Sequence, residues 1–193
     1  MALVGFKRLT IRILDGATAE KGKNLFVVEG KTGEGATQTA KITGLASDPV
    51  KTYGSDVAYY VSSRGVGDVK VELTAVDLPS KVINKILGYL DEDGIISVGA
   101  DTVSPYCSIM LESSTPSNDK AYLGFFKGQF SMDSLDLETI KEKQEELPSD
   151  SLSFSAIASD QEETKGRYHV KYFGKDEAKV NKVKAQLQIT AAV

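Results

Sequence analysis

Side chains that could perform catalysis are scarce in this chain. Cys107 is the only cysteine and His169 the only histidine. A cysteine nucleophile needs a base nearby that holds it as the thiolate. Cys107 instead alternates with the apolar residues Ile109 and Leu111, which is typical of a strand with one buried face. We therefore interpret Cys107 as a core residue and His169, flanked by basic residues, as a solvent-facing strand residue.

Two short motifs resemble ligand-binding loops but lack required residues. Gly30-Lys31-Thr32 resembles the end of a phosphate-binding loop, yet Leu25 stands where that loop needs a glycine. The segment 91–94 resembles the start of a calcium loop, but Ile95 and Ile96 replace a ligand and the turn glycine. A single cysteine also excludes a multi-cysteine metal site. We expect no catalytic residue, no cofactor and no metal, and predict that the protein is not an enzyme.

Composition narrows the possible functions further. The 193 residues carry a net charge of −4, with a pI near 5.2, which disfavours a protein that grips nucleic acid through its phosphates. No stretch approaches the roughly 18 apolar residues that cross a bilayer, so no membrane partner is expected. The length suits one core, and we predict a single domain over residues 1–193.

Period-two alternation of apolar residues dominates the chain and predicts strands. Residues 9–13 and 69–75 both predict strands with one solvated face. The same pattern recurs in several further segments, among them 57–61, 107–111, 126–132, 152–158, 168–172 and 185–189. Clusters of Gly, Asp, Asn and Ser separate these runs and favour turns. The sequence therefore predicts a mainly β fold, an antiparallel sandwich or barrel-like structure.

Three segments depart from this pattern. Residues 80–90 have apolar side chains at helical spacing behind Pro79, which predicts one flanking α-helix. Residues 135–147 combine strong helix formers with strand-like alternation and stay undecided. The glycine-rich stretch 30–54 predicts a long loop or a flexible hairpin, and loops of that length are usually functional or disordered.

Charge is distributed unevenly near the C-terminus. Residues 133–150 contain seven acids and two lysines, whereas residues 165–184 contain seven basic residues and two acids. Both could be ordinary solvated surfaces, or they could join neighbouring copies of the chain head to tail. The candidate inter-subunit residues are Glu138, Glu142, Glu145, Glu146, Lys171, Lys175 and Lys179.

An ordered series of segments resembles a known family. The segments are VGFKRLTIRILD (4–15), GLASDP (44–49), AYY (58–60), GDVKVEL (67–73), DLPS (77–80), ILGY (86–89), DEDGI (91–95), PY (105–106), LES (111–113) and FKGQFS (126–131). Together they resemble the major tail protein, or tail tube protein, family of siphophages that infect Gram-positive bacteria.

The resemblance implies a structural virion protein of the tail tube fold. It implies subunits that assemble as hexameric rings and stack into a tube for DNA ejection. It also implies a tape-measure protein and a tail terminator as partners, and a protein made in the host cytoplasm and carried in the virion. DNA would pass the acidic subunits without specific binding. The candidate ring-stacking residues in the long loop are Lys31, Glu34, Asp48 and Tyr53.

Two alternatives stay open at this point. A non-enzymatic β-sandwich binding or decoration module of a phage particle would present an aromatic-rich loop to its ligand. Polymer formation without added ligand would distinguish the tube from such a module. A tube subunit of a contractile tail is the second alternative, because tube subunits of both tail types share the architecture.

Overall fold

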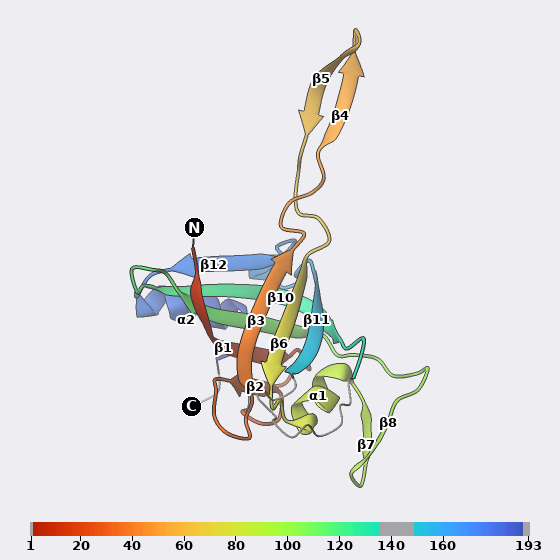
Figure 1. Ribbon diagram of the computed structural model, residues 1–193, viewed down its shortest axis with the longest axis vertical. Coiled ribbons are helices and arrows are strands. Elements are labelled where there is room, and N and C mark those ends of the chain that lie inside the picture. The colour runs from red at the N-terminus through yellow and green to blue at the C-terminus, as the bar shows by residue number, and fades with distance from the viewer. Residues whose placement is uncertain (1, 136–148, 191–193) are drawn as a thin grey trace, which may run out of the picture.

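The computed structural model describes residues 2–135 and 149–190 (Figure 1). Its strands and helices follow the chain in this order: β1 (Val4–Ile13), β2 (Leu25–Val28), β3 (Ala36–Thr43), β4 (Val50–Gly54), β5 (Val57–Ser62), β6 (Lys70–Val76), α1 (Ser80–Leu87), β7 (Leu90–Glu92), β8 (Ile95–Ser97), β9 (Cys107–Ser114), β10 (Lys120–Ser131), β11 (Ser149–Ile157), a 3₁₀ turn (Glu162–Thr164), β12 (His169–Phe173) and α2 (Glu177–Gln186). All strand pairings are antiparallel, so the predicted mainly β, antiparallel fold is confirmed.

Strand β10 joins the two layers of a sandwich. Its first half pairs with β9 and β12, and its second half pairs with β11. The register against β9 shifts between Phe125 and Gly128, and such an irregularity bends a strand. One layer therefore contains β2, β1, β9, β10 and β12, and the other contains β10, β11, β6 and β3.

The main core fills the space between these layers. Phe125, Phe130 and Phe154 belong to this core. The ring centroid of Phe154 lies 5.0 Å from that of Phe130 and 6.3 Å from that of Phe125. Burying each such ring contributes roughly 2–3 kcal/mol. The helix predicted at 80–90 is confirmed as α1, which contributes Ile86 and Leu87 to this core but ends at Leu87, because Gly88 takes the left-handed conformation and β7 begins at Leu90.

A second core covers the other face of the β9–β10 layer. Met110, Tyr122 and Phe126 point away from the main core and contact Val180 and Val183 of α2. The prediction of one flanking helix was therefore wrong in number. The alternation at residues 185–189 favoured a strand, but Asp176 begins a helix by accepting hydrogen bonds from the N–H groups of Ala178 and Lys179.

The second cover also changes strand β1, whose polar face was expected to be solvated. Thr10 is 6% exposed and Arg12 only 1%. The Arg12 guanidinium lies 3.1 Å from the Asp15 carboxylate and donates to the carbonyl of Ala17 at 2.5 Å. Asn24, also buried, donates to both Asp15 oxygens. This polar network fixes the turn that follows β1.

Residues 30–54, expected to form a long loop or flexible hairpin, contain two strands. β3 pairs with β6 inside the sandwich. β4 pairs with β5 in a hairpin that runs from Val50 to Ser62 and projects from the body (Figure 1). In the described part of the chain, no helix is long and apolar enough to span a bilayer.

Candidate assembly surfaces

The β4–β5 hairpin exposes an apolar surface. Tyr59 is 82% exposed, Tyr53 68% and Val50 67%, and Val57, Tyr60 and Val61 are exposed as well. The alternation at residues 57–61 predicted one buried face, but among the described residues both faces of the hairpin are exposed. Exposed apolar surface of this kind usually marks a contact with another molecule.

The hairpin is firmly attached to the sandwich at its base. The N–H of Gly67 donates to the carbonyl of Gly44 at 2.9 Å, and the Ser47 hydroxyl donates to the carbonyl of Arg64 at 2.8 Å. We call the two segments that connect the hairpin to the sandwich, 44–49 and 63–69, its stem. A Cβ at Gly44 would lie 1.9 Å from the carbonyl oxygen of Asp68, so the two segments approach at a distance that only glycine allows. At the tip, Ser55 and Asp56 both have positive φ, as in a type I′ turn.

A second hairpin, β7–β8, projects from the side of the sandwich (Figure 1). We call residues 89–103 the acidic arm, because they contain four acids and no Lys, Arg or His. Ile95 is 71% exposed and Val103 73%. The Asp93-Gly94 turn closes the hairpin, and Asp91 accepts a hydrogen bond from the N–H of Gly94 at 3.0 Å. The segment that resembled a calcium loop is thus a hairpin turn.

Basic residues gather on β12 and α2, on the opposite side of the molecule from the acidic arm. Lys171, Lys175 and Lys179 are all exposed. Lys175 forms an ion pair with Asp119 at 3.1 Å, and Lys179 forms one with Asp176 at 3.7 Å. Their predicted acidic counterparts lie outside the described residues: Glu138, Glu142, Glu145 and Glu146.

The four candidate stacking residues fall into two separate places. Lys31 and Glu34 lie in the turn before β3, where Lys31 contacts Glu29 at 2.5 Å and Glu34 at 3.9 Å. Asp48 lies in the stem after β3, and Tyr53 lies in the hairpin. The two pairs are therefore at opposite ends of β3 (Figure 1).

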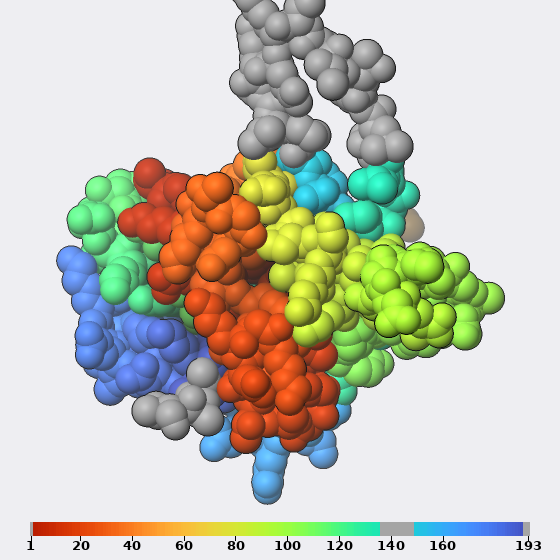
Figure 2. Space-filling model, turned by 90° about the horizontal axis from the view of Figure 1, so that it is seen from below, coloured from red at the N-terminus to blue at the C-terminus, as the bar shows by residue number. Residues whose placement is uncertain are grey.

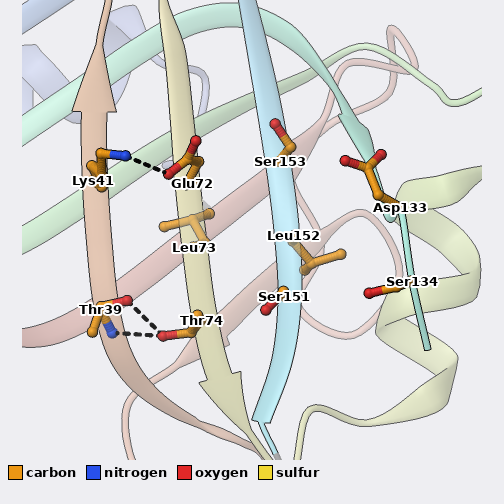
Figure 3. A pocket seen from close by; sticks show the side chains of 10 residues that line it. All are labelled: Thr39, Lys41, Glu72, Leu73, Thr74, Asp133, Ser134, Ser151, Leu152 and Ser153. Carbon is orange, nitrogen blue, oxygen red and sulfur yellow. Dashed lines mark hydrogen bonds and ion pairs between the residues drawn. The ribbon is translucent and has the colours of Figure 1, made fainter. Parts of the chain in front are cut away.

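The outward face of β3, β6 and β11 is polar and slightly hollowed. Thr39, Thr74 and Ser151 line an open depression of about 400 Å³, together with an ion pair between Lys41 and Glu72 at 3.1 Å (Figure 3). The Thr39 and Thr74 hydroxyls are hydrogen-bonded to each other at 2.6 Å. With Asp133, which also lines the depression, these groups form a polar surface of slight negative charge.

The prediction of a buried core position is confirmed for Cys107, whereas the prediction of a solvent-facing position is wrong for His169. Cys107 is fully buried, and burial raises the pKa of its thiol to about 12. His169, expected to face solvent, is half-buried with its ring centroid 6.0 Å from that of Phe125. Burial and, to a lesser degree, Lys171 lower the pKa of His169. Within residues 2–135 and 149–190, no group of three His, Cys, Asp or Glu residues could hold a metal ion.

Comparison with known proteins identifies the family. The model of the phage tail tube protein family matches residues 1–187. A search of the curated proteins found no match. The family is a structural one, which agrees with the prediction of a protein without enzymatic activity. The match covers both hairpins, the main core, α2 and all of the second core but Ile189, and the chain belongs to the phage tail tube protein family.

Proposed function

We propose that this protein is the major tail protein of a siphophage and that it self-assembles into stacked hexameric rings, which form the conduit for DNA ejection. The observation that carries the proposal is the β4–β5 hairpin, whose residues from Val50 to Val61 are all exposed. An isolated two-stranded hairpin is only marginally stable in water. Covering one of its exposed large side chains would contribute up to roughly 1.5–3 kcal/mol. A neighbouring subunit is the cover that a tail tube supplies.

The candidate stacking residues fit this arrangement. In stacked rings, one end of a subunit meets the other end of a subunit in the next ring. Asp48 and Tyr53 lie at the hairpin end of β3, and Lys31 and Glu34 lie at the opposite end (Figure 1). The hairpin of one ring would thus reach toward the Lys31 and Glu34 end of the next.

We assign the outward face of β3, β6 and β11 to the lumen of the tube. Threonine and serine hydroxyls make this face polar, and Lys41 is paired with Glu72. A face without excess positive charge would not hold the phosphates of passing DNA. In the described part of the chain β3 pairs with β6 alone, which leaves one edge of β3 open. Closing the sheet across subunits would remove this open edge.

Two further expectations stay part of the proposal. The basic residues Lys171, Lys175 and Lys179 would contact the acidic residues Glu138, Glu142, Glu145 and Glu146 of a neighbouring copy. Residues 1–193 would act as one tail tube domain, because β9 and β10 contribute to both cores and so join the elements that surround them. A tape-measure protein and a tail terminator would complete the tail, with synthesis in the host cytoplasm.

Electron microscopy of the purified protein over a range of concentration and salt tests the proposal. We expect rings or hollow tubes of uniform width. Replacing Tyr53 and Tyr59 by serine should abolish the tubes without unfolding the sandwich, whereas the control Ile157→Ser, at a side chain 41% exposed on the sandwich, should leave them. Monomers at every concentration would instead favour the binding or decoration module.

A further inference from the structure

The acidic arm exposes several large apolar side chains to solvent. Leu90 is 56% exposed, Ile95 71%, Val98 62% and Val103 73%. Four acids, Asp91, Glu92, Asp93 and Asp101, lie among these side chains. In the part of the chain that the structure describes, β7 and β8 pair with each other and do not belong to the sandwich sheet. The arm thus combines apolar side chains with one sign of charge.

A surface of the opposite charge lies on the other side of the same molecule. We call the exposed residues Lys171 of β12, Lys175 of the loop after it, and Lys179 and Lys182 of α2 the basic face; Lys175 and Lys179 are paired with Asp119 and Asp176. Tyr172 is half-buried and packs on the second core beside α2, whereas Lys171 and Phe173, 36% exposed, point to the other side of β12, so the basic face extends around this strand. The arm and α2 lie on opposite sides of the body both in Figure 1 and in the view from below in Figure 2. The β4–β5 hairpin projects in a third direction, along the long axis.

This geometry separates two kinds of contact. Complementary surfaces on opposite sides of one subunit form a head-to-tail interface, which closes into a ring when the rotation between subunits allows it. Opposite charges on the two surfaces would fix the direction of this contact and disfavour arm-to-arm or face-to-face pairs. The β4–β5 hairpin points out of the plane in which such a ring would close.

We propose that the acidic arm of one copy of this chain docks on the basic face of the next copy and forms the lateral contact within a ring. The proposal rests on the assembly into rings proposed above and adds which surfaces meet. It commits to a second copy of this chain because both halves of the contact, with matching charge, are present on one subunit. It is an alternative to the contact between these lysines and residues 138–146, because the basic face then has the acidic arm as its partner.

Charge exchange between the two surfaces tests this contact. In the arm variant, asparagine keeps the turn chemistry at Asp91 and Asp93, and the changes are Asp91→Asn, Glu92→Lys, Asp93→Asn and Asp101→Lys. In the face variant the changes are Lys171→Glu, Lys179→Glu and Lys182→Glu; Lys175 is kept because it is paired with Asp119. The control Glu162→Lys with Glu163→Lys changes an exposed turn elsewhere.

Ring formation is measured by sedimentation velocity and electron microscopy at a concentration where the wild type assembles. Each variant alone should lose rings, because its two surfaces now have the same sign. A chain that carries both sets of changes should regain them, and so should an equimolar mixture of the two variants. The control should assemble like the wild type.

The outcomes separate this contact from the general proposal. A wild type without rings would overturn the assembly proposal itself. Rings that persist in the arm variant would overturn the arm contact alone. Loss of rings in both variants without recovery in the doubly changed chain would also overturn it, because the two surfaces would then be needed for separate contacts.

Discussion

Leu187 packs against Gly124 so closely that a Cβ at residue 124 would lie 2.4 Å from the Leu187 Cδ1 atom. Gly124 lies in β10, and Leu187 follows α2 and is fully buried. The absence of a side chain at one position thus lets the end of α2 reach the sheet. The second core depends on this approach.

We expect Gly124→Ala to destabilise the protein by about 1–3 kcal/mol, since overpacking a filled site displaces its neighbours. Leu187→Ala should cost about 2–5 kcal/mol, because it leaves a cavity. Urea unfolding measures both changes. Gly54→Ala is the matched control, since a Cβ there would meet Tyr59 at an ordinary 3.7 Å. Equal stability of all three variants would contradict the packing described here.

The hydrogen bonds to the Asp15 carboxylate, from Asn24 first and then Arg12, make the stability of the protein depend on pH in the acid range. Burial alone would raise the pKa of Asp15, but hydrogen bonds from Asn24, Arg12 and the Ala17 N–H outweigh it and leave the pKa below its ordinary value of 3.8. A depressed folded-state pKa adds stability above the unfolded-state pKa, and this stability is lost as pH falls through the folded-state value.

Asp15→Asn should therefore be less stable than the wild type at pH 7 by on the order of 1 kcal/mol, since the carboxylate is partly exposed. The difference should shrink as the pH falls below 3.8. Urea midpoints of both proteins from pH 2 to 7 measure this. A difference that stays constant over the whole range would show that Asp15 is not held in its charged form by folding.

The thiol of Cys107 should be inert in the folded protein. Its pKa near 12 leaves almost no thiolate at neutral pH, and its side chain is fully buried. A thiol reagent at pH 8 should label the native protein at least about 100-fold more slowly than the protein in denaturant. Labelling at similar rates in both conditions would show that the core opens near β9.

The stem of the β4–β5 hairpin should tolerate no side chain at Gly44. The residue has a φ of 71°, and a Cβ would lie 1.9 Å from the Asp68 carbonyl oxygen. We expect Gly44→Ala to cost about 1–3 kcal/mol and to make residues 45–66 more sensitive to limited proteolysis. Gly54→Ala again serves as the control, and an unchanged digestion pattern would argue against the fixed stem.

Alternation in the sequence correctly predicted the strands that have one buried and one solvent-exposed face. In β6, Val71 and Leu73 are buried while Lys70 and Glu72 are exposed, as alternation requires. Alternation could not reveal that α2 covers the second face of the β9–β10 layer. Polar residues such as Arg12 can be buried there in a network, so period two alone does not distinguish solvent from a second core.

Helix α2 and the hairpins were harder to predict for different reasons. Val180, Val183 and Leu187 have helical spacing, and Asp176 is a good N-cap, but lysines separate the apolar residues and the alternation beyond residue 184 favoured a strand. In β5 the alternation correctly predicted a strand, but it also predicted one buried face, and Tyr59 is 82% exposed among the described residues. A single sequence does not say whether the partner of an apolar face is its own core or another subunit.

The pairing of β1 with β9 constrains when the chain can fold during its synthesis. β1 pairs with β9, and Arg8 contacts Glu112 across 104 residues of sequence. The chain must lose the entropy of closing this long loop before the contact can stabilise the fold, and topologies of this kind therefore fold slowly. During synthesis β1 must therefore wait, paired with β2 alone, until β9 has left the ribosome. The second core needs α2, which ends at Gln186, so a subunit can complete its fold only when almost the whole chain has been made.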